Sequence, residues 1–297
     1  MASYALISVQ ASITDIADRV RLLCSTLLLM QILSLVLALS LPSYGVSVGV
    51  HEGEWQGIFT HKNILGSFSA LSIAIFIGGM QFNLQYRSSA GILISLILII
   101  NSGSTTSLTT SILIISIYTL LKLKPLLAIS IRNKNLLITL LLLSNPICVA
   151  ISVFSPSLIL LSKDSSFSGR DAIWMATLNE ISKSPILGHG LSQFSYFFFG
   201  SSVTELRRLG DFATSSHNGF IDLLFSLGII GTSLFILSIF RTFNNSPPTY
   251  FSIKIITITC LIIINTFETR LISLNIYFVA FLFISKLSNI DLNYKKV

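Results

Sequence analysis

Three short segments carry most of the side chains in this chain that are suited to chemistry. They are GIFTHKNILG at 57–66, SGRDAIW followed by SPILGHG within 168–190, and SSHNGF at 215–220. Together they supply lysine and arginine cations and three histidines. Forked guanidinium donors and a lysine point charge are what a diphosphate needs. A histidine near its neutral form can accept a proton from a hydroxyl, so His217, at the edge of an apolar run, is the candidate base.

Each of these residues also has a structural interpretation. Lys62 could extend to the membrane interface from a helix end. Arg170 could be a solvated residue in the first turn of a helix, and His189, between two glycines, could be a turn residue. His217 could belong to the cap of the following helix, with Ser216 or Asn218 as the capping residue.

Acidic residues near the apolar segments are few. Asp222 falls about one turn into the segment that follows His217, where we expect it to pair with Asn218. An acid inside a bilayer is costly, so it should face a wet cavity or a cation. Glu268 and Arg270 are interpreted as a structural ion pair at the outer end of a span.

The composition identifies an integral membrane protein. Hydrophobic residues make up 52% of the 297 positions and charged residues only 10%, whereas about 25% of the residues of a soluble domain are charged. A span needs about twenty apolar residues. Eight segments qualify, and we expect two short helices around 101–106 rather than one broken helix. The predicted spans are 22–41, 64–81, 88–102, 105–121, 135–155, 219–240, 252–267 and 270–287.

Charge sets the predicted orientation. With eight spans both termini share a side, and that side, with its termini and short connections, collects twelve of the nineteen lysine and arginine residues. By the positive-inside rule this side is cytoplasmic, and all four histidines lie on the outer face.

The predicted architecture is all-α and polytopic, a single membrane domain over 1–297 with one long outer loop at 156–218. Within that loop, Ser168 to Asp171 resemble a capping box that opens a short amphipathic helix. Its tryptophan, Trp174, predicts that this helix lies on the membrane surface.

Several functional classes are excluded or disfavoured. There is no P-loop, no dinucleotide fingerprint, no D-x-D signature and no H-E-x-x-H motif, so a cytosolic nucleotide substrate is disfavoured. The three cysteines lie far apart within apolar segments and indicate neither a disulfide framework nor a zinc site. The formal charge of +7 is scattered between spans and forms no stripe for nucleic acid.

The segments GEWQGIFTHKNILG, GRDAIW with SPILGHGLSQF, and SSHNGFIDLLFSLGIIG resemble the O-antigen ligase and polymerase superfamily, most closely its exopolysaccharide production branch. The resemblance covers roughly 35–285. It implies a GT-C-like helix bundle that works on the periplasmic face without metal or other cofactor. It also implies donors in which a glycan is linked to undecaprenyl diphosphate, and a glycan or lipid acceptor.

The resemblance also implies roles for particular residues. His217 matches the family's histidine proposed to activate the acceptor hydroxyl, and Arg170 matches its outer-loop arginine. The HKN-type element corresponds to His61, Lys62 and Asn63. His189 and Asn218, in the other two segments, are further candidates for substrate binding.

The chain departs from the family pattern in three places. NSGSTTS at 101–107 lacks an arginine that many ligases have there, and Ser226 stands where many members have a glutamate. Relatives typically carry about four more spans at the amino end, so we expect a shortened bundle.

The functional hypothesis is inverting glycosyl transfer. Arg170, with Lys62, would hold the donor diphosphate, and His217 would accept the proton of the attacking hydroxyl. The polyprenyl tail would lie in a groove between spans, and other exopolysaccharide assembly proteins would be partners. The alternative is a transporter or flippase of the same lipid-linked glycan. It is disfavoured because the polar groups gather at one face and no internal repeat is visible.

Overall fold

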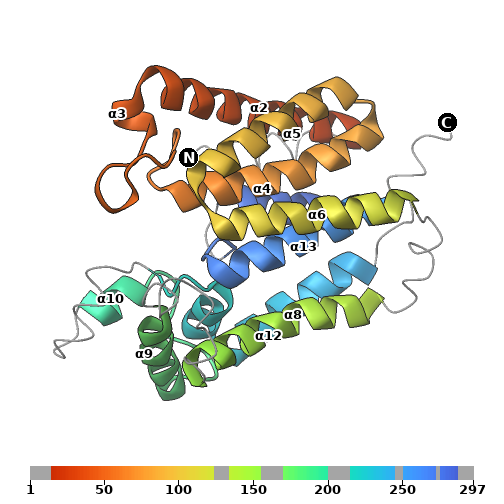
Figure 1. The fold of residues 1–297 in the computed structure, drawn as a ribbon. Helices are drawn as coiled ribbons and strands as arrows, with labels where there is room; N and C mark the ends of the chain where they lie inside the picture. Colours follow the sequence, from red (N-terminus) through yellow and green to blue (C-terminus); the bar gives the residue numbers. More distant parts are fainter. Residues whose placement is uncertain are drawn as a thin grey trace. The chain divides into compact units, whose positions relative to one another are not determined.

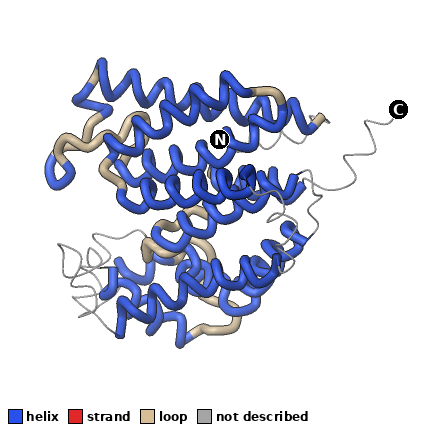
Figure 2. Tube along the Cα trace, turned by 45° about the vertical axis from the view of Figure 1, so that its right-hand side comes forward, coloured by secondary structure: helices blue, strands red, loops and turns tan. Residues whose placement is uncertain are grey.

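The computed structural model describes residues 15–123, 134–154, 170–199, 215–244, 250–271 and 275–286. Within these ranges the chain consists of helices joined by loops, without a β-strand (Figures 1 and 2). Gly103 adopts a left-handed conformation with φ +63° and separates α5 from α6. The expected pair of short helices around this point is therefore confirmed.

Each of the eight segments predicted to span the membrane contains a helix, although the last helix begins at Ile276 rather than at residue 270. Among the described helices, α2, α4 with the short turn after it, α6 and α12 are long and apolar enough to cross a bilayer. The protein is therefore an all-α polytopic membrane protein, as predicted. The eight helices are α2 (Ile16–Ser40), α4 (Lys62–Gly79), α5 (Gln85–Ser102), α6 (Thr105–Leu123), α8 (Lys134–Phe154), α12 (Gly219–Asn244), α13 (Phe251–Phe267) and α14 (Ile276–Lys286).

The chain divides into two compact units, and the first is built around α4. This unit comprises residues 1–132, 245–264 and 274–297. Every residue of α4 from Leu65 to Gly79 is buried. Small residues allow the close packing: an added Cβ at Gly91 of α5 would overlap the Phe76 ring, and one at Gly78 would overlap Ile253 of α13. Such small-residue contacts are typical of helix packing in membranes.

The second unit comprises residues 133–244 and 265–273 and contains α8, α9 (Arg170–Lys183), α10 (Phe194–Phe199) and α12. Helix α9 is the helix expected in the outer loop, and it packs against α8 and α12. Its expected capping residues Ser168 and Gly169 lie outside the described residues. Trp174 is fully buried within this unit, and the position of the helix at the membrane surface stays a prediction.

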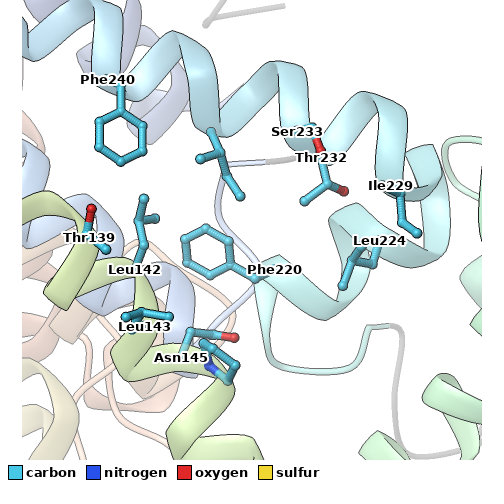
Figure 3. A pocket seen from close by; sticks show the side chains of 12 residues that line it. Thr139, Leu142, Leu143, Asn145, Phe220, Leu224, Ile229, Thr232, Ser233 and Phe240 are labelled. Atoms are coloured by element: carbon cyan, nitrogen blue, oxygen red, sulfur yellow. The ribbon is translucent and has the colours of Figure 1, made fainter. Parts of the chain in front are cut away.

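Helix α12 is not the continuous span that was predicted. Gly228 has φ +60° and ψ −167°, which breaks the helix into arms at 219–227 and 229–244. This backbone conformation is accessible essentially to glycine alone. The two arms meet at a sharp bend and face one another across a cavity (Figure 3).

The loop at 185–190 explains how the break is tolerated. The amides of His189 and Gly190 donate to the carbonyls of Phe225 and Ser226 at 2.8 and 2.9 Å, and Ile229 N–H donates to the Pro185 carbonyl at 2.8 Å. The loop thus satisfies backbone groups that the bend removes from the helix, as a low-dielectric environment requires. The SPILGHG segment is therefore a docking loop for the bend in α12.

Gly228→Ala tests this interpretation. A Cβ at residue 228 would lie 2.2 Å from the Ile186 carbonyl oxygen, and the backbone would be strained as well. The matched control is Gly190→Ala, because Gly190 also has a positive φ, +97°, but its nearest neighbour would be 3.5 Å away. We expect Gly228→Ala to destabilise the purified protein by about 2 kcal/mol more than the control, measured by thermal unfolding. Equal losses would contradict the docking role.

Candidate active site

The turn at 215–218, which precedes α12, is fixed by side chains from other elements. Trp174 Nε1 of α9 donates to the Ser216 carbonyl at 2.8 Å. Ser216 N–H donates at 3.0 Å to Asp222 Oδ1, from the first arm of α12. These contacts hold His217 in a left-handed conformation with φ +54°, which is uncommon for a residue other than glycine.

Asn218 is the N-terminal cap of α12. Its Oδ1 accepts hydrogen bonds from the backbone N–H groups of Phe220 and Ile221 at 3.1 and 3.2 Å. The same oxygen accepts from Asn145 Nδ2 of α8 at 3.1 Å. The carbonyl oxygen of this buried amide is thus engaged in structure, which agrees with the capping alternative.

Glu268 brings three cationic or titratable side chains together. Arg170 Nη2 lies 3.3 Å from its Oε1, and Arg270 Nη2 lies 3.4 Å from its Oε2. His217 Nδ1 lies 3.6 Å from the same Oε2. Arg170 Nη1 also donates to the Phe267 carbonyl at 2.9 Å. The structure therefore places Arg170 and His217, two of the predicted site residues, around one carboxylate.

The cluster is largely shielded from solvent. The Glu268 side chain is 10% exposed and the Arg170 side chain 16%, whereas His217 is 35% exposed. Burial alone would raise the pKa of Glu268, but the contact with His217 and the charges of Arg270 and Arg170 more than offset it. The pKa of this carboxyl is therefore held below its ordinary value. Glu268 is an anion that two arginines and the histidine share.

A second carboxylate fixes the segment that carries Glu268. Asp222 Oδ2 accepts a hydrogen bond from the Thr269 hydroxyl, and not the predicted pairing with the Asn218 side chain. Asn265 Oδ1 accepts from the N–H groups of Arg270 and Leu271 at 3.2 and 3.1 Å. A Cβ at Gly219 would overlap the Asn265 amide, so only glycine fits where this segment meets α12.

The HKN element lies in the first unit. The His61 side chain caps α4, with Nδ1 accepting from Asn63 N–H at 3.1 Å. Lys62 Nζ lies 2.8 and 2.6 Å from the two carboxylate oxygens of Glu54, and His51 Nδ1 lies 3.1 Å from Glu54 Oε2. The sequence predicted that the Lys62 cation binds the substrate, whereas in the structure it forms an ion pair with the Glu54 carboxylate.

His189 has a different environment from His217. Its ring stacks on Phe225 with centroids 4.8 Å apart and meets the edge of Phe197 at 4.4 Å. Its Nε2 lies 2.9 Å from the Glu180 carbonyl oxygen. These contacts agree with the structural interpretation of His189, as part of the docking loop.

Sequence reasoning missed the central position of Glu268, and the roles of Trp174 and Asp222 as supports of the turn. The short distance in sequence between Glu268 and Arg270 predicted an ion pair between them, and the structure confirms it. Arg170 is almost one hundred residues away from Glu268, and no periodicity or motif connects them. Within the described ranges, no three histidine, cysteine, aspartate or glutamate side chains are arranged to hold a metal ion.

Comparison with known families identifies the class of protein. The family model for O-antigen ligase matches residues 90–236, close to half of the chain. The chain belongs to the O-antigen ligase and polymerase superfamily. The matched region contains Arg170, His189 and His217, while Glu268 and Arg270 lie beyond it. A comparison with curated proteins gives no match. This O-antigen ligase family member is therefore a multi-pass membrane enzyme of glycan assembly.

Trp174→Phe tests the support of the turn. The change keeps an aromatic ring but removes the donor to the Ser216 carbonyl, which leaves a buried acceptor unsatisfied at a cost of about 1–3 kcal/mol. Met175→Leu is the control, because Met175 is the neighbouring residue and is 58% exposed. We expect thermal unfolding to show a lower midpoint for Trp174→Phe alone. Indistinguishable midpoints would show that the tryptophan N–H does not secure the turn.

The Glu268 cluster predicts a dependence of stability on pH. Because the folded-state pKa of Glu268 is below its ordinary value of 4.5, its stabilising contribution is present above that value and is lost as the pH falls through the folded-state pKa. We expect the unfolding midpoint of the wild type to fall more steeply below about pH 4.5 than that of Glu268→Gln. Other acidic residues contribute equally to both proteins, so parallel curves would refute the assignment.

Proposed function

We propose that this enzyme is a metal-independent inverting glycosyltransferase that uses glycan units linked to undecaprenyl diphosphate. The observation that supports this proposal best is the Glu268 cluster, which joins two arginines to a histidine beside the N-terminus of α12. Arginines suit the diphosphate leaving group, and the histidine suits the attacking hydroxyl.

His217 is proposed as the general base. Its Nδ1 faces the Glu268 carboxylate at 3.6 Å, an arrangement that favours a proton on Nδ1 and leaves Nε2 to accept one. A carboxylate that fixes the tautomer of a catalytic histidine is a recurring arrangement in enzymes. The partial exposure of the imidazole allows an acceptor sugar to approach. Glu268 is thus a positioning residue for His217.

Arg170 and Arg270 are proposed to bind the donor diphosphate. Their side chains are 16% and 15% exposed and contact a single carboxylate. As the glycosidic bond breaks, the diphosphate keeps the bonding electrons, and the guanidinium groups stabilise that charge. Lys62 is a weaker candidate, because both oxygens of Glu54 already neutralise it. Roles for His61, Asn63, His189 and Asn218 in binding stay predictions.

The overall reaction transfers a glycan from the lipid diphosphate to a hydroxyl of another glycan or of a lipid. We favour polymerisation of an exopolysaccharide repeat, on the resemblance of the three sequence segments to that branch. Both termini are proposed to lie in the cytoplasm of a cell whose inner membrane holds the protein, because basic residues gather in the short connections on their side. The site then faces the periplasm.

His217→Asn is the decisive substitution. Asparagine tolerates the left-handed backbone of residue 217 but cannot act as a base. Purified protein would be incubated with an undecaprenyl-diphosphate repeat unit and chelator, without nucleotide, and the products separated by gel. We expect elongation by the wild type and a loss of about 10²–10⁴-fold in rate for His217→Asn.

The control is His51→Asn, the same chemical change at a histidine that contacts Glu54 in the first unit. It should elongate the glycan at the wild-type rate. Normal elongation by His217→Asn would exclude His217 as the base. If the wild type moves the lipid-linked unit across vesicle membranes but never elongates it, the transporter alternative replaces the enzyme.

A further inference from the structure

The docking loop at 185–190 presents apolar side chains to the outside of the second unit. Ile186 and Leu187 are 61% and 72% exposed, and Leu191, just after the loop, is 55% exposed. The sequence around them contains no lysine, arginine, aspartate or glutamate from residue 184 to residue 204. An exposed apolar surface of this kind marks contact with another protein or with a membrane.

The depth of the bend at Gly228 favours the membrane. The second arm of α12 runs from this bend to Arg241, an exposed charged residue that marks one boundary of the hydrocarbon region. At 1.5 Å per residue the helix covers about 20 Å between these two positions, whereas the hydrocarbon region is about 30 Å thick. The bend and the loop docked on it therefore lie within the leaflet that is remote from Arg241.

The exposed side chains of the loop adjoin the apolar surface of that arm. The N–H groups of Ile229 and Ile230 donate to the carbonyls of Pro185 and Ile186 at 2.8 and 3.3 Å, which fixes the loop beside the start of the arm. Farther along the arm, Ile230 and Leu234 lie about one turn apart and are 50% and 62% exposed. Apolar side chains exposed on a membrane-spanning helix contact lipid, so the surface of the loop continues one that already faces the bilayer.

Polar groups of the loop backbone are paired within the protein. Gly188 N–H donates to the Ser184 carbonyl at 3.1 Å, and the Ser184 hydroxyl donates to the Gly188 carbonyl at 2.9 Å. The N–H groups of His189 and Gly190 donate to carbonyls of α12, and the His189 ring stacks on Phe225. Non-helical backbone is tolerated at membrane depth only where the protein supplies such partners. The loop meets this condition.

We propose that residues 184–191 form a re-entrant segment whose apolar side chains contact the acyl chains of the bilayer. The sequence predicts an outer loop over these residues, whereas the structure gives them the exposed apolar side chains and the paired backbone of a membrane-embedded segment. Contact with the bilayer then helps to hold the bend of α12, and with it the arm that begins just after His217. The inference does not depend on the reaction that the enzyme catalyses.

Spin labelling of the full chain in lipid nanodiscs tests the proposal. A nitroxide is attached through p-acetylphenylalanine inserted at residue 187, so that the native cysteines stay in place. Its collision rates are measured with oxygen, which concentrates in lipid, and with a water-soluble nickel chelate. The same label at Leu234 is the lipid reference, and at Glu52, an exposed position in the first unit, the water reference. We expect the ratio of oxygen to nickel collisions at residue 187 to match that at residue 234 and to exceed that at residue 52 several-fold.

Two other results would overturn the proposal. Nickel collisions as frequent at residue 187 as at residue 52 would place the segment in water. Low collision rates with both reagents would show that protein, and not lipid, covers Leu187.

Leu187→Glu provides a measurement without a label. A carboxylate in contact with hydrocarbon is costly, whereas the same change at an exposed position in water is close to neutral. Leu187→Met is the matched control, because it keeps an apolar side chain of similar volume. We expect Leu187→Glu to lower the midpoint of thermal unfolding in nanodiscs by several degrees and Leu187→Met to leave it unchanged. Equal midpoints for the two variants would refute the contact with acyl chains.

Discussion

The second unit depends on the Glu268 carboxylate, because this buried anion keeps three segments from separate parts of the chain together. Arg170 comes from the start of α9, His217 from the turn before α12, and Arg270 from the segment after α13. Withdrawing charges from water costs several kcal/mol per ion unless the geometry of the pairing is good. A second set of contacts supplies that geometry, since Asp222 ties the turn to Thr269 and Trp174 ties it to α9. The cluster and its supports are therefore one cooperative unit, in which the loss of any support loosens the rest.

The broken helix α12 follows from the same demand for satisfied polar groups. In a membrane environment an unpaired backbone amide or carbonyl costs several kcal/mol, so a helix can bend sharply only where another segment supplies partners. The loop at 185–190 does so with four backbone hydrogen bonds. Gly188 and Gly228 allow the two backbones to approach, because a Cβ on either would overlap the other segment. Gly188 and Gly228 thus shape the site indirectly, because the bend that they allow sets the direction of the two arms of α12.

Most of the fold could be predicted from the sequence, while the site could be predicted only in part. Long apolar runs give helices wherever the bilayer removes water, so each of the eight predicted spans contains a described helix, and the turn at Gly103 lies where two helices rather than one were expected. His217 and Arg170 were found by residue type and by family resemblance. Their meeting at Glu268 could not be found, because it depends on tertiary contacts across almost one hundred residues. The break at Gly228 was missed because its apolar flanks have the same composition as a continuous span. The burial of Trp174 was not foreseen, because its partner, a backbone carbonyl, leaves no mark in the sequence.

The two histidine-containing segments at 61–63 and 215–218 show why environment rather than residue type decides a role. Each combines a histidine, an asparagine and a nearby cation. In the first, Lys62 meets both oxygens of Glu54, and His61 is used as a helix cap through its ring nitrogen. In the second, the capping is done by Asn218, which leaves the His217 ring to face Glu268. Because the asparagine caps the helix, the histidine need not, and the left-handed backbone at 217 turns its ring toward the arginine cluster. The choice of capping residue therefore separates a histidine that caps a helix from one whose ring faces the Glu268 carboxylate.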